Sequence, residues 1–283
     1  MKTAIITDST SYLTEDMIMR YDIRVISLNV IFKNEVFVEA DYNAEQFYER
    51  MRTEKQLPTT SQPTTGEYVT LLEQLKEEGF TDCISIHLSS GISGTFQNAI
   101  TAGEMVEGIT LYAFDSEIAC MVAGMFTLRA AELKDILPPE AIIEELTNMR
   151  ARSNAYFLVD DLKNLQKGGR LNGAQAIIGS MLQVKPILHF EDKVIVPFDK
   201  VRTKKKAVQF VQSKISEEVS GPATIVVIHA NAQSEAEAIR AQLQEQFPEA
   251  DIIISYFGPV IGTHLGEKSL GVGYVHHKFE MFQ

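Results

Sequence analysis

The sequence lacks tryptophan and has only two cysteines, Cys83 and Cys120, among 283 residues. Both lie in apolar surroundings without a Cys-x-x-Cys or Cys/His pattern, so no metal site is expected. We interpret them as reduced thiols in the core of a cytoplasmic protein. No apolar run approaches the roughly 20 residues of a membrane-spanning helix. The N-terminal apolar stretch is too short for a signal peptide and meets Asp8 at once.

Positive charge is also scarce. The chain has 26 Lys and Arg against 38 Asp and Glu, a net charge of −12. This balance argues against general affinity for nucleic acid or anionic membranes, since both need a basic face, but it does not exclude small basic islands. A transient membrane contact is still allowed. With 45% hydrophobic and 23% charged residues, the composition is that of a globular protein, and the length favours one large or two modest domains.

The alternation of short apolar runs with longer helical patterns predicts the fold class. In the first half, strands are expected at 4–8, 23–32, 35–40, 82–89 and 109–115, with helices at 43–54, 65–79, 94–108 and 118–133. This order predicts an α/β domain with a parallel sheet flanked by helices over residues 1–155. A hairpin near Glu191 and Asp192 predicts a mixed α/β sheet in a second domain, residues 156–283.

A glycine-rich turn, "LSSGISGTFQNA" (88–99), leads from a predicted strand into a helix. The unpaired N–H groups at a helix start attract a carboxylate or a phosphate, but Ser93 could equally be a simple helix cap. The turn has neither the GxxxxGK[ST] pattern of a nucleotide loop nor the GxSxG pattern of a nucleophile elbow.

Two further stretches share this polar character. In "PTTSQPTTGEY" (58–68), Pro58 and Pro63 are expected to stiffen a loop whose hydroxyls could bind a carboxylate, although a plain polar loop fits as well. The stretch 256–274 contains five glycines and is expected to be irregular. His264 lies among those glycines, as a candidate donor to an anion.

Five motifs in this order resemble those of the bacterial DegV family: "TDST", "TTSQPT", "SSGISGTFQNA", "LQKGGRLNG" and "GPVIGTHLG". Each is weak alone, but the five in register span essentially the whole chain. The resemblance implies a fatty-acid-binding subunit of the bacterial fatty acid kinase. Such carriers are non-catalytic and need no cofactor. They hold one long-chain fatty acid in a tunnel between two domains and present its carboxylate to a separate ATP-dependent kinase, for phospholipid metabolism.

The resemblance also implies the site residues. By motif position, the carboxylate would be bound by Thr60, Ser93 and His264, and the adjacent Ser61, Gly94 and Thr95 complete the predicted set. Arg170, after the double glycine, would dock the kinase. One departure is clear: the family often has Gly-Pro-Gly after the histidine motif, where this chain has Gly266-Glu267-Lys268.

The apolar stretches 118–131 and 176–188 combine small, flexible and branched residues, as a tunnel lining would, although such stripes also form ordinary cores. The tail-lining candidates are Met121, Met125, Phe126, Ile177, Ile178 and Met181.

A basic island, "KVRTKKKA" (200–207), makes Arg202 a second candidate for kinase docking. Thr203 is expected to cap a helix whose first turn carries three lysines, an arrangement that opposes the helix dipole. We interpret Arg170 and Arg202 as partner contacts rather than lipid contacts.

The sequence also leaves two enzymatic alternatives open. A serine acyl hydrolase would use Ser93 with His264, oriented by Asp8 or Asp115. A metal-dependent phosphotransferase would use Asp8, Asp115, Asp160 and Asp161, but the chain has no nucleotide loop, and aspartates at strand ends are often caps.

Overall fold

The predicted parallel sheet of the first half is present. The computed structural model describes residues 2–160, 162–171 and 184–282, and its first sheet has four parallel strands in the order β2-β1-β6-β7. These strands are β1 (Thr3–Asp8), β2 (Ile23–Ile26), β6 (Asp82–His87) and β7 (Thr110–Asp115). Every residue of β1 and β6 is buried, because helices cover both faces of the sheet.

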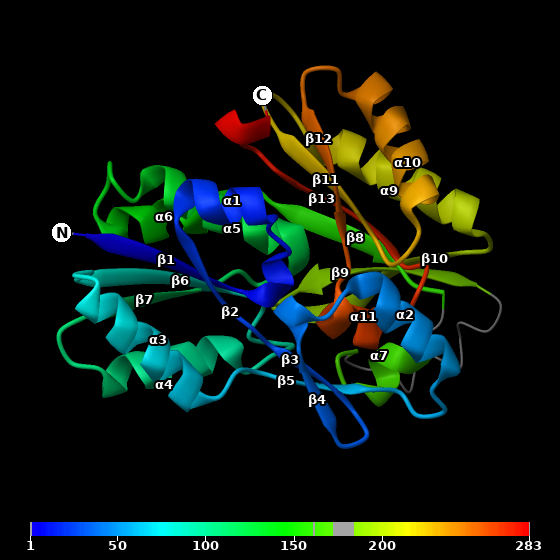
Figure 1. The fold of residues 1–283 in the computed structure, drawn as a ribbon. Helices are drawn as coiled ribbons and strands as arrows, with labels where there is room; N and C mark the ends of the chain where they lie inside the picture. Colours follow the sequence, from blue (N-terminus) through cyan, green and yellow to red (C-terminus); the bar gives the residue numbers. More distant parts are fainter. Residues whose placement is uncertain (1, 161, 172–183, 283) are drawn as a thin grey trace.

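Figure 1 shows the helices on the two faces of this sheet. On one face lie α1 (Glu15–Tyr21), α5 (Cys120–Leu133) and α6 (Pro139–Arg150), and on the other lie α3 (Thr65–Glu77) and α4 (Thr95–Met105). Thr64 and Glu67 form a capping box at the start of α3. Helix α5 is buried on nearly all sides, which explains why its sequence is apolar around the whole helix.

The second half forms a six-stranded mixed sheet in the order β10-β9-β8-β13-β11-β12, as expected for an α/β protein of two sheets. Its strands are β8 (Asn154–Leu158), β9 (Lys185–Glu191), β10 (Val194–Val201), β11 (Thr224–His229), β12 (Asp251–Tyr256) and β13 (Leu270–Val275). Only β11 and β12 are paired in parallel; the other neighbours are antiparallel, including the predicted β9–β10 hairpin. Helices α9 (Lys204–Glu218) and α10 (Gln233–Gln246) pack on one face.

The strand predicted over 23–32 is two strands. The chain leaves the parallel sheet after β2, turns at Ser27 and Leu28, and continues as β3 (Asn29–Phe32) in a small antiparallel sheet. Its neighbours there are β4 (Glu35–Val38) and β5 (Thr59–Ser61). The predicted loop 58–68 thus begins with a short strand. An apolar run of ten residues cannot reveal that its two halves serve different sheets.

The glycine-rich segment 256–274 is more regular than expected. It contains α11 (Pro259–Leu265), and Pro259 occupies the first helical position, where its missing N–H costs nothing. Gly258 and Gly262 do not turn the chain: a Cβ at these positions would lie 2.3 Å from the Tyr12 ring and 2.4 Å from the Tyr48 hydroxyl. These glycines therefore allow close packing of α11 against the first half of the chain.

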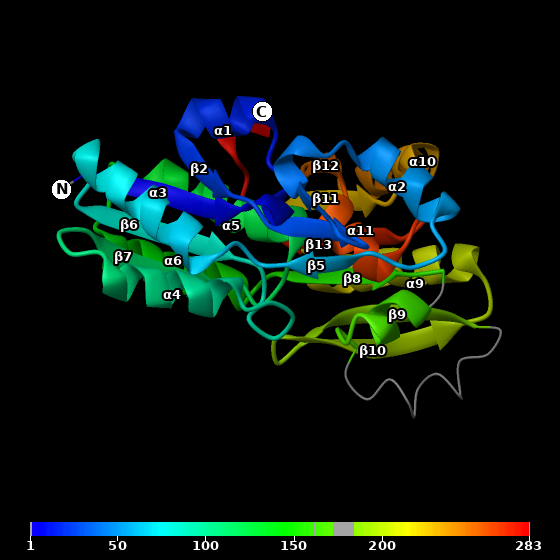
Figure 2. The same ribbon diagram turned by 60° about the horizontal axis from the view of Figure 1, so that its bottom comes forward.

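Two views place α11 among elements from the N-terminal half. Figures 1 and 2 show it beside β3, β5 and α2 (Ala44–Thr53), and α7 (Lys163–Lys167) packs against it as well. The Tyr48 hydroxyl on α2 donates to the carbonyl of Phe257, just before α11, at 2.6 Å. A segment near the C-terminus is thus held by residues more than 200 positions earlier.

One hydrophobic core extends across both large sheets. It includes Ile5 and Ile84 of the first sheet together with Val226 and Val275 of the second. The predicted domain boundary at 155 falls one residue inside β8, the first strand of the second sheet. Because the core is continuous, the division into domains 1–155 and 156–283 remains a prediction.

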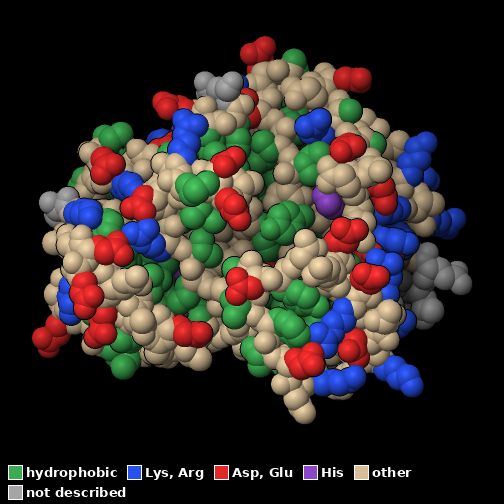
Figure 3. All heavy atoms as spheres, viewed as in Figure 1, with side chains coloured by type: hydrophobic (Ala, Val, Ile, Leu, Met, Phe, Trp, Pro, Cys, Tyr) green, Lys and Arg blue, Asp and Glu red, His purple; other side chains and the backbone are tan. Residues whose placement is uncertain are grey.

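The surface is predominantly acidic, in line with the net charge. Figure 3 shows basic side chains along the right-hand edge of one face, where Figure 1 places α2, α7 and α9. Of the helices described, none combines the length and apolar character needed to cross a membrane.

Candidate functional site

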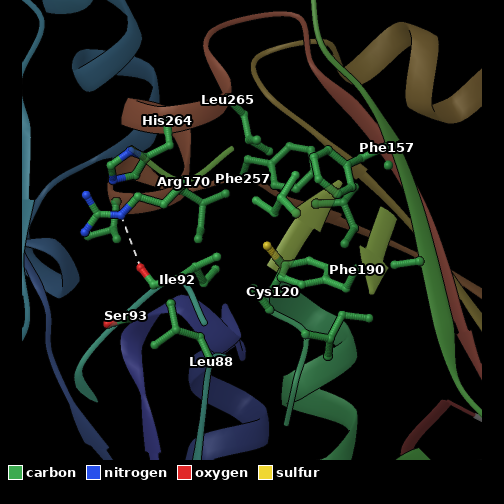
Figure 4. A pocket seen from close by; sticks show the side chains of 18 of the residues that line it. Leu88, Ile92, Ser93, Cys120, Phe157, Arg170, Phe190, Phe257, His264 and Leu265 are labelled. Atoms are coloured by element: carbon green, nitrogen blue, oxygen red, sulfur yellow. Dashed lines mark hydrogen bonds between the residues drawn. The ribbon is translucent and has the colours of Figure 1, made fainter. Parts of the chain in front are cut away.

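An apolar cavity of about 280 Å³ lies between the two large sheets. Its wall on the N-terminal side includes Leu88 and Ile118, and three phenylalanines, Phe157, Phe190 and Phe257, line it from the C-terminal half (Figure 4). Cavities of this kind, apolar with a few polar groups at one end, are typical of small-molecule sites. The walls come from both halves of the chain, so the cavity exists only when the two sheets pack together.

The polar end of the cavity joins three separate segments. Thr60 lies on β5, Ser93 lies in the turn before α4, and His264 lies on α11; all three line the cavity. The Thr60 hydroxyl and His264 Nε2 are 2.9 Å apart and hydrogen-bonded. Ser61 and Gly94 line the cavity too. Five of the six residues predicted to bind a carboxylate therefore meet at one end of one cavity.

Thr95 is the exception. It is completely buried at the first position of α4 and does not line the cavity. Its hydroxyl lies 2.9 Å from the Ser93 Oγ, so it can orient that serine without reaching a ligand. Gly94 is the residue that caps the helix, and Ser93 Oγ accepts from the Thr95 N–H at 3.3 Å.

The other serines of the turn have structural partners. Ser89 Oγ donates to the backbone carbonyl of Lys193, in the β9–β10 turn, at 2.6 Å. Ser90 donates its N–H and its hydroxyl to Asp115, at the end of β7. Since these hydroxyls are occupied, Ser93 is the serine of this turn whose side chain faces the cavity mouth (Figure 4).

His264 is partly buried between the cavity and the turn that follows α7. Burial, reinforced by the charge of Arg170, lowers its pKa to about 4, so its imidazole is neutral at pH 7. Nδ1 is buried without a hydrogen-bond partner among the described residues. It faces Gly168, where a Cβ would lie 2.3 Å from Nδ1. The first glycine of the "KGGR" motif therefore makes room for the histidine ring.

The second glycine of that motif has a different role. Gly169 has a φ of +71°, a conformation that favours glycine, and it turns the chain back toward the cavity. Arg170 then donates from Nε to the carbonyl of Ile92 at 3.2 Å (Figure 4) and from Nη1 to the carbonyl of Gly168. Burial lowers the pKa of its guanidinium. Arg170 thus lines the cavity beside His264, whereas the sequence suggested a contact for a partner alone.

The tail-lining prediction needs correction. Met121, Met125 and Phe126 are buried in α5 but are not among the residues that line the cavity, because they face the core between α5 and its neighbours. Of this helix, Cys120 at its first position lines the cavity. Ile177, Ile178 and Met181 lie outside the described residues. An all-apolar helix gives no sequence signal for which side meets the cavity.

The basic island at 200–207 folds as expected, with Thr203 capping α9 through the Lys206 N–H at 3.2 Å. Lys204 is paired with Glu235 at 2.8 Å. Arg202 is exposed and lines none of the cavities described here. It remains a candidate for a partner contact.

In the segment Gly266-Glu267-Lys268, which departs from the family motif, the Glu267 carboxylate is held by neighbouring side chains. Glu267 accepts from Asn231 at 2.7 Å and pairs with Arg52 at 3.4 Å, while Gly266 ends α11 with a φ of +80°. The Gly-Glu-Lys sequence thus joins α11 to its neighbours and leaves His264 in place.

The geometry does not assemble the triad of the hydrolase alternative. The hydrogen bonds of Ser93 are to Thr95, and His264 Nε2 is bonded to Thr60. Asp8 and Asp115 are bonded to other residues, so neither orients His264. Among the described residues, no group of His, Cys, Asp or Glu is arranged to hold a metal ion.

Sequence reasoning missed two buried polar clusters. In one, His87 bridges Asp8 at 3.1 Å and Ser85 at 2.8 Å, a serine–histidine–aspartate chain that is completely buried and ties β1 to β6. In the other, Glu39 accepts from Ser9 at 2.5 Å and from the Val260 N–H at 2.8 Å, which fastens the start of α11. An acidic residue directly after an apolar strand was the available signal for Glu39, but nothing in the sequence shows its burial.

The fold and the site define a two-sheet α/β protein with an apolar cavity and a polar mouth. The chain belongs to the DegV family: the family model described as "Uncharacterised protein, DegV family" matches residues 2–277. It is 50% identical over 275 residues to a DegV domain-containing protein of Listeria monocytogenes, covering 96% of this chain and 97% of that protein. It is 49% identical over 277 residues to protein DegV of Bacillus subtilis, covering 96% and 98%.

Solved structures are similar over almost the whole chain. The crystal structure of DegV, a fatty acid binding protein from Bacillus subtilis, has a TM-score of 0.93 and 48% identity, covering 98% of this chain and 100% of that one. A fatty acid binding DegV family protein from Streptococcus agalactiae has a TM-score of 0.92 and 33% identity, with the same coverage.

Proposed function

We propose that this chain is a fatty acid carrier that buries the tail of one long-chain fatty acid and holds its carboxylate at Thr60, Ser93 and His264. The observation that carries the proposal is an apolar cavity that ends at this hydrogen-bonding cluster. The solved relatives described as fatty acid binding proteins support it. No cofactor is needed for this activity.

The two ends of the ligand would contribute differently. Each buried CH₂ stabilises the complex by about 0.8 kcal/mol, so about ten of them supply roughly 8 kcal/mol, which corresponds to a micromolar Kd. The hydroxyls of Thr60 and Ser93 supply charge-assisted hydrogen bonds, and Arg170 adds a favourable positive charge. The tail therefore sets the affinity and the mouth sets the orientation.

Native mass spectrometry of the purified protein, with solvent extraction of what is bound, tests the proposal. We expect one fatty acid per chain, either co-purifying or taken up from added palmitate or oleate. A protein that is empty and binds neither acid would refute the carrier.

We further propose that the bound carboxylate is presented to a separate ATP-dependent kinase, which forms the acyl phosphate. The position of the carboxylate site supports this role, because Thr60, Arg170 and His264 line both the apolar cavity and a second, basic cavity beside it. The carrier itself would perform no turnover, and it would act in the cytoplasm.

Replacing Ser93 by alanine should weaken palmitate binding about 10- to 150-fold, since a hydrogen bond to a charged group contributes about 1.5–3 kcal/mol. The fold should persist, because the main-chain turn is held by Ser89 and Ser90. The measurement is fluorescence displacement with a labelled fatty acid. Thr101→Ala, which removes an exposed hydroxyl from α4, is the matched control. Equal affinities in both variants would argue against the carboxylate assignment.

Two arginines separate lipid binding from partner docking. Arg202→Ala should lower the rate of kinase-dependent acyl phosphate formation and leave palmitate affinity unchanged, because its side chain is exposed and away from the cavity. Arg170→Ala should lower both, because Arg170 lines the mouth. The rate of acyl phosphate formation is measured with the purified kinase, and palmitate affinity is measured by fluorescence displacement. If Arg170→Ala binds palmitate like the native protein, its role is confined to the partner.

A further inference from the structure

A second cavity, of about 410 Å³, lies directly beside the mouth of the apolar one. The two cavities share Thr60, Arg170 and His264. A head group bound at these residues would have the apolar cavity on one side and this second cavity on the other. We call the second cavity the outer chamber.

The outer chamber is basic, in a protein of net charge −12. Its wall includes Lys55, from the segment after α2, Lys167, from the end of α7, and Arg170. None of the described residues that line it is acidic. Within the part of the chain that the structure describes, none of these three cations forms an ion pair. By contrast, Lys33 and Arg52, which precede Lys55 in the sequence, are both paired with glutamates.

Neutral polar groups complete the wall of the outer chamber. The Thr59 and Thr60 hydroxyls and the Asn164 amide line it, and each can donate a hydrogen bond. His264 joins the two cavities, since its Nε2 faces Thr60 and its unpartnered Nδ1 faces Gly168, a residue of the chamber wall. Three cations that form no ion pair among the described residues, together with neutral donors in the same wall, suit a group with several anionic oxygens.

We propose that the outer chamber binds the phosphoryl group of an acyl phosphate, with Lys55 and Lys167 as the residues that distinguish it from a plain carboxylate. This rests on the proposed function, in which a carboxylate oxygen forms a bond to the γ-phosphorus of ATP. The bond from that phosphorus to the β–γ bridging oxygen breaks, and ADP leaves. The product carries about one more negative charge than the fatty acid and extends beyond the mouth, into the outer chamber.

A hydrolysis-resistant probe tests this assignment without the kinase. Hexadecylphosphonate has an apolar tail like that of palmitate and a phosphoryl-like head group. Its Kd and that of palmitate are measured for the native protein and for Lys55→Gln/Lys167→Gln. We expect the double variant to bind the phosphonate about tenfold more weakly, as the loss of two charge-assisted contacts implies, and palmitate within twofold of the native affinity. Phosphonate binding should also fall more steeply with salt.

Lys205→Gln is the matched control, because Lys205 is an exposed lysine of α9 that lies outside both cavities. It should change neither affinity. Suppose that the native protein binds palmitate, and that the phosphonate has the same affinity for the double variant as for the native protein. The outer chamber is then not a phosphoryl site. If palmitate itself fails to bind the native protein, the carrier function fails instead.

Discussion

Alanine at Gly168 should displace His264 and lower palmitate affinity by about 10- to 100-fold, since overpacking a close contact costs about 1–3 kcal/mol. A Cβ at this position would lie 2.3 Å from His264 Nδ1 and 3.1 Å from the backbone carbonyl oxygen of Asn164. The backbone itself is not strained, because Gly168 has an ordinary helical φ of −75°. The loss should therefore come from the contact with the imidazole, and fluorescence displacement measures it.

The double variant Gly168→Ala/His264→Ala identifies the source of the effect. If the added methyl group lowers palmitate affinity by displacing the imidazole, it should lower the affinity little further when that ring is absent. The double variant should then bind palmitate like His264→Ala alone. Gly66→Ala is the matched control: no heavy atom lies within 4 Å of a Cβ there, and alanine favours the helix α3. If the losses of palmitate affinity add up in the double variant, Gly168 is needed for a reason other than its contact with the His264 ring.

Glu39 and His264 should impose opposite pH dependences on the free energy of unfolding. Burial raises the Glu39 pKa from 4.5 to about 7, so the folded state binds this proton more tightly than the unfolded chain and stability falls as pH rises from 4.5 to 7. Burial lowers the His264 pKa from 6.5 to about 4, so stability rises with pH from about 4 to 6.5. Each contribution amounts to about 3 kcal/mol.

Glutamine substitutions separate the two contributions. In the native protein they oppose one another between pH 4.5 and 6.5. Glu39→Gln should leave stability rising with pH in that range, and His264→Gln should leave it falling. Urea unfolding followed by circular dichroism at several pH values measures the slopes, with Glu73→Gln on the exposed face of α3 as the control. Identical slopes in the two variants would contradict the assignment.

Glu39 should also matter for the site itself. Its carboxyl group accepts from the Val260 N–H and from the Tyr12 hydroxyl, and Tyr12 in turn accepts from the Ile261 N–H at 3.3 Å. These bonds join the first turn of α11, which carries His264, to the end of β1. The buried carboxyl group thus positions the histidine helix through contacts between the two halves of the chain.

Much of the fold followed from the order of apolar runs. The parallel sheet, the β9–β10 hairpin and the cap at Thr203 were predicted correctly, because each depends on local periodicity or on a side chain a few residues from its partner. The split at Ser27 and the helix around His264 were missed. In both places the path of the chain depends on packing against distant segments.

The amino-acid sequence alone determined the alternation of strands and helices and the hydroxyl, glycine and histidine motifs from which Thr60, Ser93 and His264 were chosen. Only the tertiary structure decided that these three meet at one cavity, that phenylalanines rather than the α5 methionines line it, and that Arg170 faces its mouth. The physical reason is the sequence separation over which each interaction acts. Periodicity and capping act within a few residues, whereas the distance between Thr60 and His264 is set by how helix α11 packs against strand β5, 204 positions earlier in the sequence.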